Sequence, residues 1–356
     1  MKLQLLIVAV AFLLNPLAQA QLTPERLYNG VGRTLVIEVE APDEPGGPVE
    51  IVLHDRPGGR AVARSPVVRG RADLAGLFPM LWEGPERVLY AQLMVNGEGV
   101  GSPLVLDPMW NPDRGRLTDP ATGRPTNDPR RGRVVFDSER GTAAAEAATT
   151  GNAWAPVPEG FTDEPVFAGL RVYQARFVEW DTDRGTVVFR LRPDAAPNTA
   201  FWHLHLVEGG FYRDIEIHRI VDRLDSGERF VVQVGDPTGT GNGGPGFDFD
   251  LEQSTLGHDF GVLSMARAGD PDTNGSQVFV ALGRPGTARL DGRYAAFGEV
   301  VSGQEALNAI ASVGVDENDR PLEPVLLRAA RSVPAPALDR WPQPAGDPRI
   351  ERAGGR

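Results

Sequence analysis

Residues 216–247 constrain the fold most, because two β-rich runs in this stretch are separated and followed by turn sequences. At the first run, Ile215 and Ile217 alternate with polar neighbours, as the residues of a half-buried strand do. Residues 230–234 form a second run rich in β-branched side chains, and Gly235-Asp236-Pro237 ends it with turn residues. This pattern predicts two short neighbouring strands.

Hydrogen-bonding and aromatic side chains occur together on these two predicted strands. Arg219 lies on the first, and Phe230 and Gln233 lie on the second. A polar insert, residues 222–229, joins the strands beside these side chains, and a glycine-rich loop, residues 239–247, follows them. Two polar side chains beside an aromatic one suit a site that grips an extended peptide.

Several further segments, taken with these strands, resemble the cyclophilins, which are peptidyl-prolyl cis/trans isomerases. The matching segments are Ile217-His218-Arg219, Phe230-Val231-Val232-Gln233-Val234-Gly235-Asp236, the glycine-rich loop, Leu263-Ser264-Met265-Ala266-Arg267-Ala268-Gly269, Thr273-Asn274-Gly275-Ser276-Gln277-Val278-Phe279-Val280 and Leu290-Asp291-Gly292-Arg293-Tyr294-Ala295-Ala296-Phe297-Gly298. The resemblance runs from about residue 172 to about residue 327. The chain is thereby identified as a member of this family, and we expect it to be a bacterial, exported, multidomain one.

The resemblance implies a mainly β fold, a closed eight-stranded antiparallel barrel with two capping helices. Closing the sheet leaves no exposed edge. The helices are expected at residues 197–208, where Gly209-Gly210 follows, and at residues 305–310. Short β-rich runs separated by Gly, Pro, Asp and Asn between residues 34 and 107 indicate a small all-β, sandwich-like domain before the barrel.

The resemblance also implies a site that needs no cofactor or metal. Arg219 would stabilise the twisted prolyl bond, with Gln233 and Phe279 completing the catalytic group. The substrate-binding residues that it implies are Phe230, Val231, Ala266, Arg267, Leu290 and Tyr294. The expected substrates are unfolded or Pro-containing polypeptides, and the expected function is to assist the folding of exported proteins.

Three positions depart from the family pattern. Ile217 replaces an aromatic residue, Val231 stands where methionine is usual, and Arg289 stands where tryptophan is frequent. That tryptophan is associated with binding the inhibitor cyclosporin, so we expect cyclosporin to inhibit this chain weakly. His218 is adjacent to Arg219, but strand alternation turns it to the opposite face, where we expect it to pack and form hydrogen bonds.

The N-terminal sequence predicts export to the periplasm or cell envelope. Residues 1–20 contain Lys2, an apolar run and an Ala18-Gln19-Ala20 cleavage site, as a secretory signal peptide does. No later stretch is apolar and long enough to cross a bilayer, so no membrane span is expected after signal cleavage. The chain has no cysteine, and its formal net charge of −12 argues against nucleic-acid binding.

Composition predicts five parts in the 356-residue chain. The first is the signal peptide, residues 1–20, and the second is the all-β domain, residues 21–107. Residues 108–165 lose periodicity and contain many turn formers, which predicts a linker. The isomerase domain is then expected at residues 166–333, before a disordered Pro-rich tail, residues 334–356.

Other motif interpretations are less favoured. The glycine-rich loop does not open a helix, as a dinucleotide-binding loop must, and residues 270–281 lack the Glu that closes a calcium loop. His203 and His205 point to different faces of a predicted helix, and no Ser/His/Asp set has supporting sequence context. One alternative function stays open, a non-catalytic binding module or scaffold for Pro-containing segments. The retained Arg219 favours the enzyme, because binding alone would not require it.

Overall fold

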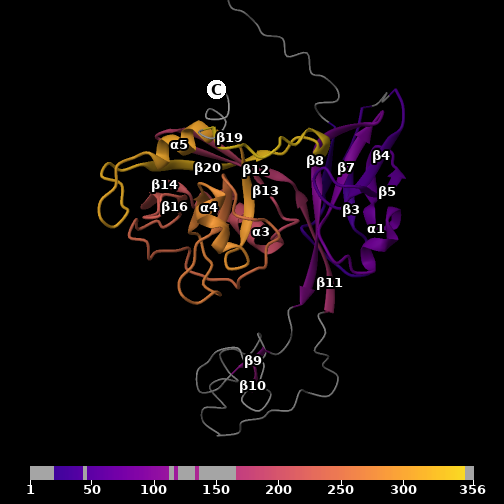
Figure 1. Ribbon diagram of the computed structural model, residues 1–356. Helices are drawn as coiled ribbons and strands as arrows, with labels where there is room; N and C mark the ends of the chain where they lie inside the picture. Colours follow the sequence, from indigo (N-terminus) through magenta and orange to yellow (C-terminus); the bar gives the residue numbers. More distant parts are fainter. Residues whose placement is uncertain (1–19, 43–45, 112–115, 119–132, 136–165, 349–356) are drawn as a thin grey trace, which may run out of the picture.

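A computed structural model describes residues 20–42, 46–111, 116–118, 133–135 and 166–348 of the chain. Figure 1 shows two β-rich units side by side, the N-terminal one in indigo to magenta and the other in pink to yellow. The predicted signal peptide lies outside the described residues, except for Ala20. None of the described helices is long and apolar enough to cross a membrane.

Two antiparallel sheets form the N-terminal unit. One has three strands in the order β1-β3-β6, and the other has six in the order β2-β11-β8-β7-β4-β5. Apolar side chains from both sheets, such as Ile37 and Leu104, share one buried core, so the unit is sandwich-like as predicted. Its elements are β1 (Gln21–Pro24), β2 (Tyr28–Gly30), β3 (Val36–Glu40), β4 (Val49–His54), β5 (Ala61–Pro66), β6 (Gly70–Asp73), α1 (Leu74–Leu77), η2 (Pro79–Trp82), β7 (Leu89–Val95), β8 (Glu98–Asn111) and β11 (Val166–Gln174).

The boundary between the two units differs from the predicted one at residue 166. Strand β11 pairs with β8, with Val172 opposite Leu106, and so belongs to the N-terminal sheet. Residues 112–165 therefore join two neighbouring strands of one sheet instead of linking two domains. Within them, β9 (Arg116–Thr118) pairs with β10 (Arg133–Val135). The sequence misled here because 166–174 is a β-rich run that directly precedes the family match.

The second unit is a curled antiparallel sheet of nine strands in the order β14-β20-β12-β13-β19-β17-β18-β16-β15. It has one strand more than the eight expected, because the run around Ile217 is divided between β14 and β15. Strands β12 and β13 form an antiparallel hairpin. The strands are β12 (Arg176–Thr182), β13 (Gly185–Leu191), β14 (Arg213–Glu216), β15 (Arg219–Arg223), β16 (Arg229–Val234), β17 (Val262–Met265), β18 (Val278–Ala281), β19 (Ala296–Ser302) and β20 (Leu326–Pro334).

Both predicted helices are present, as α3 (Pro197–Glu208) and α5 (Gln304–Ala311). They contribute Leu204 and Ile310, among others, to the core inside the curled sheet. Three short helical segments complete the unit: α4 (Arg284–Thr287), η4 (Ala288–Leu290) and η5 (Leu338–Arg340). The mainly β, cyclophilin-like fold class is therefore confirmed.

The C-terminal segment was expected to be disordered, and for residues 334–348 this is wrong. Trp341 is only 8% exposed and packs edge-to-face against Tyr90 of the first unit and Phe177 of the second. The Leu338 backbone N–H donates to the Gln92 Oε1 at 2.8 Å. Proline removes backbone donors, but large apolar side chains in the same segment can still bury their surface against both units. The rest of the tail, 349–356, lies outside the described residues.

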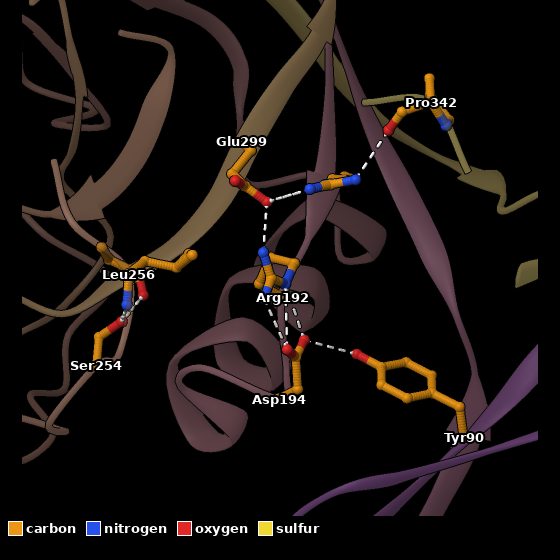
Figure 2. Close-up of polar contacts among 9 residues, drawn as sticks. Tyr90, Arg192, Asp194, Ser254, Leu256, Glu299 and Pro342 are labelled. Carbon is orange, nitrogen blue, oxygen red and sulfur yellow. Dashed lines mark hydrogen bonds and ion pairs between the residues drawn. The ribbon is translucent and has the colours of Figure 1, made fainter. Parts of the chain in front are cut away.

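Charged groups add to this junction, as Figure 2 shows. Arg192 forms ion pairs with Asp194 at 2.8 Å and with Glu299 at 2.7 Å. The Tyr90 hydroxyl, which comes from β7, donates to the same Asp194 at 2.9 Å. Hydrogen bonds to charged groups that are largely shielded from water are stronger than neutral ones. The two units are thus joined by an apolar cluster and a polar network.

Candidate active site

The three predicted catalytic residues are neighbours on the curled sheet. Arg219 of β15 is opposite Gln233 of β16, and Gln233 is opposite Phe279 of β18. Ser264 of β17 continues this row. Because directly paired residues project from the same face of a sheet, the four side chains form one line across four strands. The adjacent row points into the core.

An apolar cluster lies beside this row. Val231, Ala266, Phe279 and Leu290 are buried together, with Phe230 and Tyr294 packed partly against them. The rings of Phe279 and Tyr294 meet edge-to-face, 5.6 Å between centroids. Five of the six predicted substrate-binding residues are therefore in one cluster with the predicted catalytic Phe279. Such a cluster offers the apolar surface that a proline ring would need.

The sixth predicted substrate-binding residue, Arg267, lies at the edge of the same cluster. Its guanidinium carbon is 4.6 Å from the centre of the Tyr294 ring, and its Nε donates to the Arg293 carbonyl at 3.1 Å. Arg289 lies over another member of the cluster, with its guanidinium carbon 4.8 Å from the centre of the Phe230 ring. Guanidinium groups at such distances are attracted to an aromatic face.

A cleft of about 540 Å³ extends from the site toward the glycine-rich loop, and Gln233, Ala266 and Arg267 line one part of it. Gln277 connects the two regions. Its Oε1 accepts from Gln233 at 2.9 Å, and its Nε2 donates to the carbonyls of Gly241 and Gly243, both at 2.9 Å. These bonds fix the position of Gln233 relative to the loop.

Asp236 organises the glycine-rich loop from within. Its carboxylate accepts from the backbone N–H groups of Thr238 at 2.7 Å and Gly241 at 2.6 Å. Burial alone would raise the pKa of Asp236, but these and further hydrogen bonds hold that pKa well below its usual range. Gly235 has φ 107°, and a Cβ there would lie 2.3 Å from the Ser276 carbonyl oxygen. Only glycine fits this close approach.

Sequence reasoning missed a hydrogen-bonded chain behind Phe279. His258 stacks on the Phe279 ring at 5.7 Å, and its Nδ1 lies 2.8 Å from Asp291 Oδ1. Its Nε2 lies 3.0 Å from Ser264 Oγ. Burial lowers the pKa of His258, which keeps the ring neutral, so that Nδ1–H donates to Asp291 and Nε2 accepts from the serine hydroxyl.

The hydrogen bonds link Ser264, His258 and Asp291 in the order of a Ser/His/Asp catalytic set, which the sequence analysis did not find. His258 and Ser264 are, however, fully buried. A buried hydroxyl cannot reach a substrate, so these three hydrogen-bonded residues support the Phe279 ring instead of supplying a nucleophile. Asp291 and Ser264 both lie in segments that matched the family. The missing signal was His258, which falls outside those segments and is brought in only by the tertiary fold.

His218 lies between β14 and β15 and is buried. Its two ring nitrogens have no hydrogen-bond partner among the described residues, so the expected hydrogen bonding is not found. Desolvation lowers its pKa, which favours a neutral ring. In the part of the chain that the structure describes, there is no group of three or more His, Asp or Glu side chains able to hold a metal ion.

The polar insert between β15 and β16 is anchored at its base. Arg229 is buried and forms ion pairs with Asp222 at 3.1 Å and with Asp347 of the C-terminal segment at 2.9 Å. Removing one partner of a buried ion pair is strongly destabilising, because the other charge is left unpaired. The C-terminal segment therefore contacts the strand that carries Phe230 and Gln233.

Comparison with known proteins identifies the class of this fold and site. A family model described as cyclophilin type peptidyl-prolyl cis-trans isomerase/CLD matches residues 177–332. The chain is 40% identical over 153 residues to the peptidyl-prolyl cis-trans isomerase ppi1 of Schizosaccharomyces pombe, covering 42% of this chain and 93% of that protein. It is 39% identical over 163 residues to the peptidyl-prolyl cis-trans isomerase-like 1 of Emericella nidulans, covering 44% and 95%.

Two further matches are a relative much longer than the matched region and a solved structure. The peptidyl-prolyl cis-trans isomerase-like 2 of Rhizopus delemar is 36% identical over 185 residues, which is 50% of this chain but only 33% of that protein. A solved Cryptosporidium parvum cyclophilin type isomerase, determined in the presence of the dipeptide Ala-Pro, is 32% identical, with a TM-score of 0.40 over 44% of this chain and 97% of that one. These relatives are eukaryotic.

The chain belongs to the cyclophilin-type peptidyl-prolyl cis/trans isomerase family, and it is an enzyme of that class.

Proposed function

We propose that this isomerase acts on unfolded or Pro-containing polypeptides by a non-covalent mechanism in which Arg219 stabilises the twisted X–Pro bond. The observation that carries the proposal is the row formed by Arg219, Gln233 and Phe279 beside an apolar cluster. A cationic donor, an amide and a ring-sized apolar surface thus meet at one place.

The chemistry follows from the electronic structure of the peptide bond. The lone pair of the prolyl nitrogen is delocalised into the carbonyl, which gives a rotation barrier of about 18–20 kcal/mol. Twisting the bond makes the nitrogen pyramidal and localises that lone pair. A donor held near the nitrogen therefore stabilises the twisted state more than either planar isomer, which is the condition for catalysis.

Each predicted residue has a separate task in this mechanism. Arg219 is suited to donate because a guanidinium stays charged and carries rigidly arranged N–H groups. Gln233 would hold the substrate backbone while its own amide is positioned by Gln277. Phe279 and the pocket around it would seat the proline ring, so that rotation occurs on the other side of the bond. Val231 shortens one wall of that pocket.

We further propose that the enzyme is exported to the periplasm or cell envelope of a bacterium, where it assists newly translocated proteins. Support comes from the signal-peptide pattern of residues 1–20. Sequencing the N-terminus of protein isolated from its natural source checks this, because signal cleavage would leave Gln21 as the first residue. An N-terminus at Met1 would contradict export through this signal.

A protease-coupled assay on a short X–Pro peptide tests the proposed reaction. The full-length protein should convert the cis isomer faster than the uncatalysed exchange, which takes tens to hundreds of seconds. A rate no greater than the uncatalysed one, from a folded sample that still binds the peptide, would instead indicate a binding module.

A further inference from the structure

A carboxylate lies against the proposed catalytic arginine. An Nη2 atom of Arg219 is 3.4 Å from Asp319 Oδ2, in the loop between α5 and β20. Within the described residues, Asp319 is the sole ion-pair partner of Arg219. Gln233, the neighbour of Arg219 on the adjacent strand, donates to Gln277 instead. The Arg219 guanidinium thus contacts Asp319, a residue 100 positions away in the sequence.

The loop that carries Asp319 is closed by its own hydrogen bonds. The Asp316 carboxylate accepts from the backbone N–H groups of Asn318 at 2.8 Å and Arg320 at 3.0 Å. The Asp316 N–H donates to the Arg320 carbonyl at 2.8 Å, and the Asp319 N–H donates to the Asp316 carbonyl at 3.2 Å. Asp319 itself has φ 63°, in the left-handed region, where Asp is tolerated better than most residues.

The same loop is fastened to the strand that carries Arg219. The Ile220 N–H, next to Arg219 in the chain, donates to the Asp319 carbonyl at 2.8 Å. On the other side, Arg320 donates from Nη2 to the Gly239 carbonyl of the glycine-rich loop at 2.6 Å. The backbone of residue 319 is therefore fixed relative to β15, and its carboxylate is presented at a set place beside the guanidinium.

We propose that Asp319 is a positioning residue for catalysis, which holds the Arg219 guanidinium in the orientation that meets the prolyl nitrogen. The inference rests on the proposed role of Arg219. An arginine side chain has several rotatable bonds, and a large part of its rotamer freedom must be lost before its N–H groups can act on one atom. A fixed carboxylate supplies that restriction before the substrate arrives, so its effect falls on turnover and not on substrate affinity.

The expected size of the effect follows from exposure. The side chains of Arg219 and Asp319 are 41% and 40% exposed, so the pair is open to solvent and to salt. Exposed ion pairs of this kind are weak. Losing one changes the equilibrium between a guanidinium paired with the carboxylate and an unpaired guanidinium about two- to five-fold. We therefore expect kcat to fall about two- to five-fold when the carboxylate is removed.

The test compares kcat and KM on one X–Pro peptide for the full-length protein, Asp319→Gly, Asp319→Asn and the matched control Glu317→Gln. Glycine accepts a positive φ, so Asp319→Gly keeps the loop conformation while it removes the carboxylate. Asparagine keeps an acceptor oxygen, so its kcat should lie between those of the glycine variant and the wild type. Glu317→Gln removes an exposed charge from the same loop and should leave kcat unchanged.

Two further readouts separate positioning from a structural role. Rising ionic strength should lower the wild-type kcat toward that of Asp319→Gly, whose own kcat should respond less, because salt screens an exposed pair. In an Arg219→Ala background, Asp319→Gly should have no additional effect. An unchanged kcat for Asp319→Gly, a loss confined to KM, or an equal loss without Arg219 would overturn the proposal. A wild-type protein without activity would refute the proposed function itself and is a different result.

Discussion

Trp341 provides a quantitative test of the way the C-terminal segment joins the two units. The indole is 8% exposed, contacts Tyr90 and Phe177 with centroid distances of 5.8 and 5.3 Å, and donates from Nε1 to the Pro336 carbonyl at 2.8 Å. Trp341→Ala removes this packing and leaves a cavity between the units. Such substitutions lower the free energy of unfolding by about 3–5 kcal/mol.

Urea or thermal denaturation of the full-length protein measures this loss. At roughly 2–4 °C per kcal/mol for domains of 150–250 residues, Tm should fall by about 6 °C or more. Trp202→Ala is the matched control, because Trp202 is 37% exposed on α3, and its replacement should cost about 1 kcal/mol or less. A decrease in the free energy of unfolding below about 1 kcal/mol for Trp341→Ala would refute the view that this residue stabilises the junction between the two units.

Three other predictions concern inhibition, pH and domain independence. Arg289 places a guanidinium over Phe230, and bound cyclosporin would desolvate that charge without pairing it. Arg289→Trp should therefore tighten cyclosporin binding with only a modest change in turnover. Tight inhibition of the wild type by cyclosporin would contradict this. Burial lowers the pKa of His203 to about 3, so its contribution to stability is complete above its unfolded pKa of about 6.5 and is lost as pH falls toward 3. Between pH 7 and pH 5 this group should lower the free energy of unfolding by about 2 kcal/mol. Denaturation measured at each pH should show that His203→Gln flattens the dependence of the free energy of unfolding on pH. An unchanged dependence would show that His203 titrates normally. A fragment of residues 175–348 keeps the whole curled sheet and Asp347, the partner of buried Arg229, and should isomerise. A fragment of residues 166–348 also carries an unpaired β11 and should be less soluble, as sedimentation and the peptide assay will show; equal solubility would argue that β11 needs no partner.

The site was predictable where it depended on strand alternation and local motifs. Arg219 and Gln233 were expected on neighbouring strands, and the antiparallel register places them in one row with Phe279. Asp319 was not predictable in this way. Its role depends on a contact across 100 residues of chain, made by a loop whose sequence resembles any polar turn.

The parts of the fold that were mispredicted depend on long-range pairing. Strand β11 is a β-rich run like the strands that follow it, and only its pairing with β8 and β2 assigns it to the N-terminal sheet. The C-terminal segment was predicted to be disordered because it is rich in proline, but Leu338 and Trp341 pack on a surface that exists only when both units are folded. Local sequence cannot indicate such a surface, because it is formed by residues from three distant segments.

Comparing the turnover and the peptide affinity of Arg219→Ala is the most direct test of the central claim. If the guanidinium acts chiefly on the twisted bond, kcat should fall about 10²- to 10³-fold, as for other donors that act in a transition state, while the Kd of an X–Pro peptide changes little. Arg223→Ala, on the same strand and also exposed, is the matched control and should retain activity. Equal losses in turnover and affinity for Arg219→Ala would show that this arginine only anchors the substrate, and would contradict the proposed mechanism.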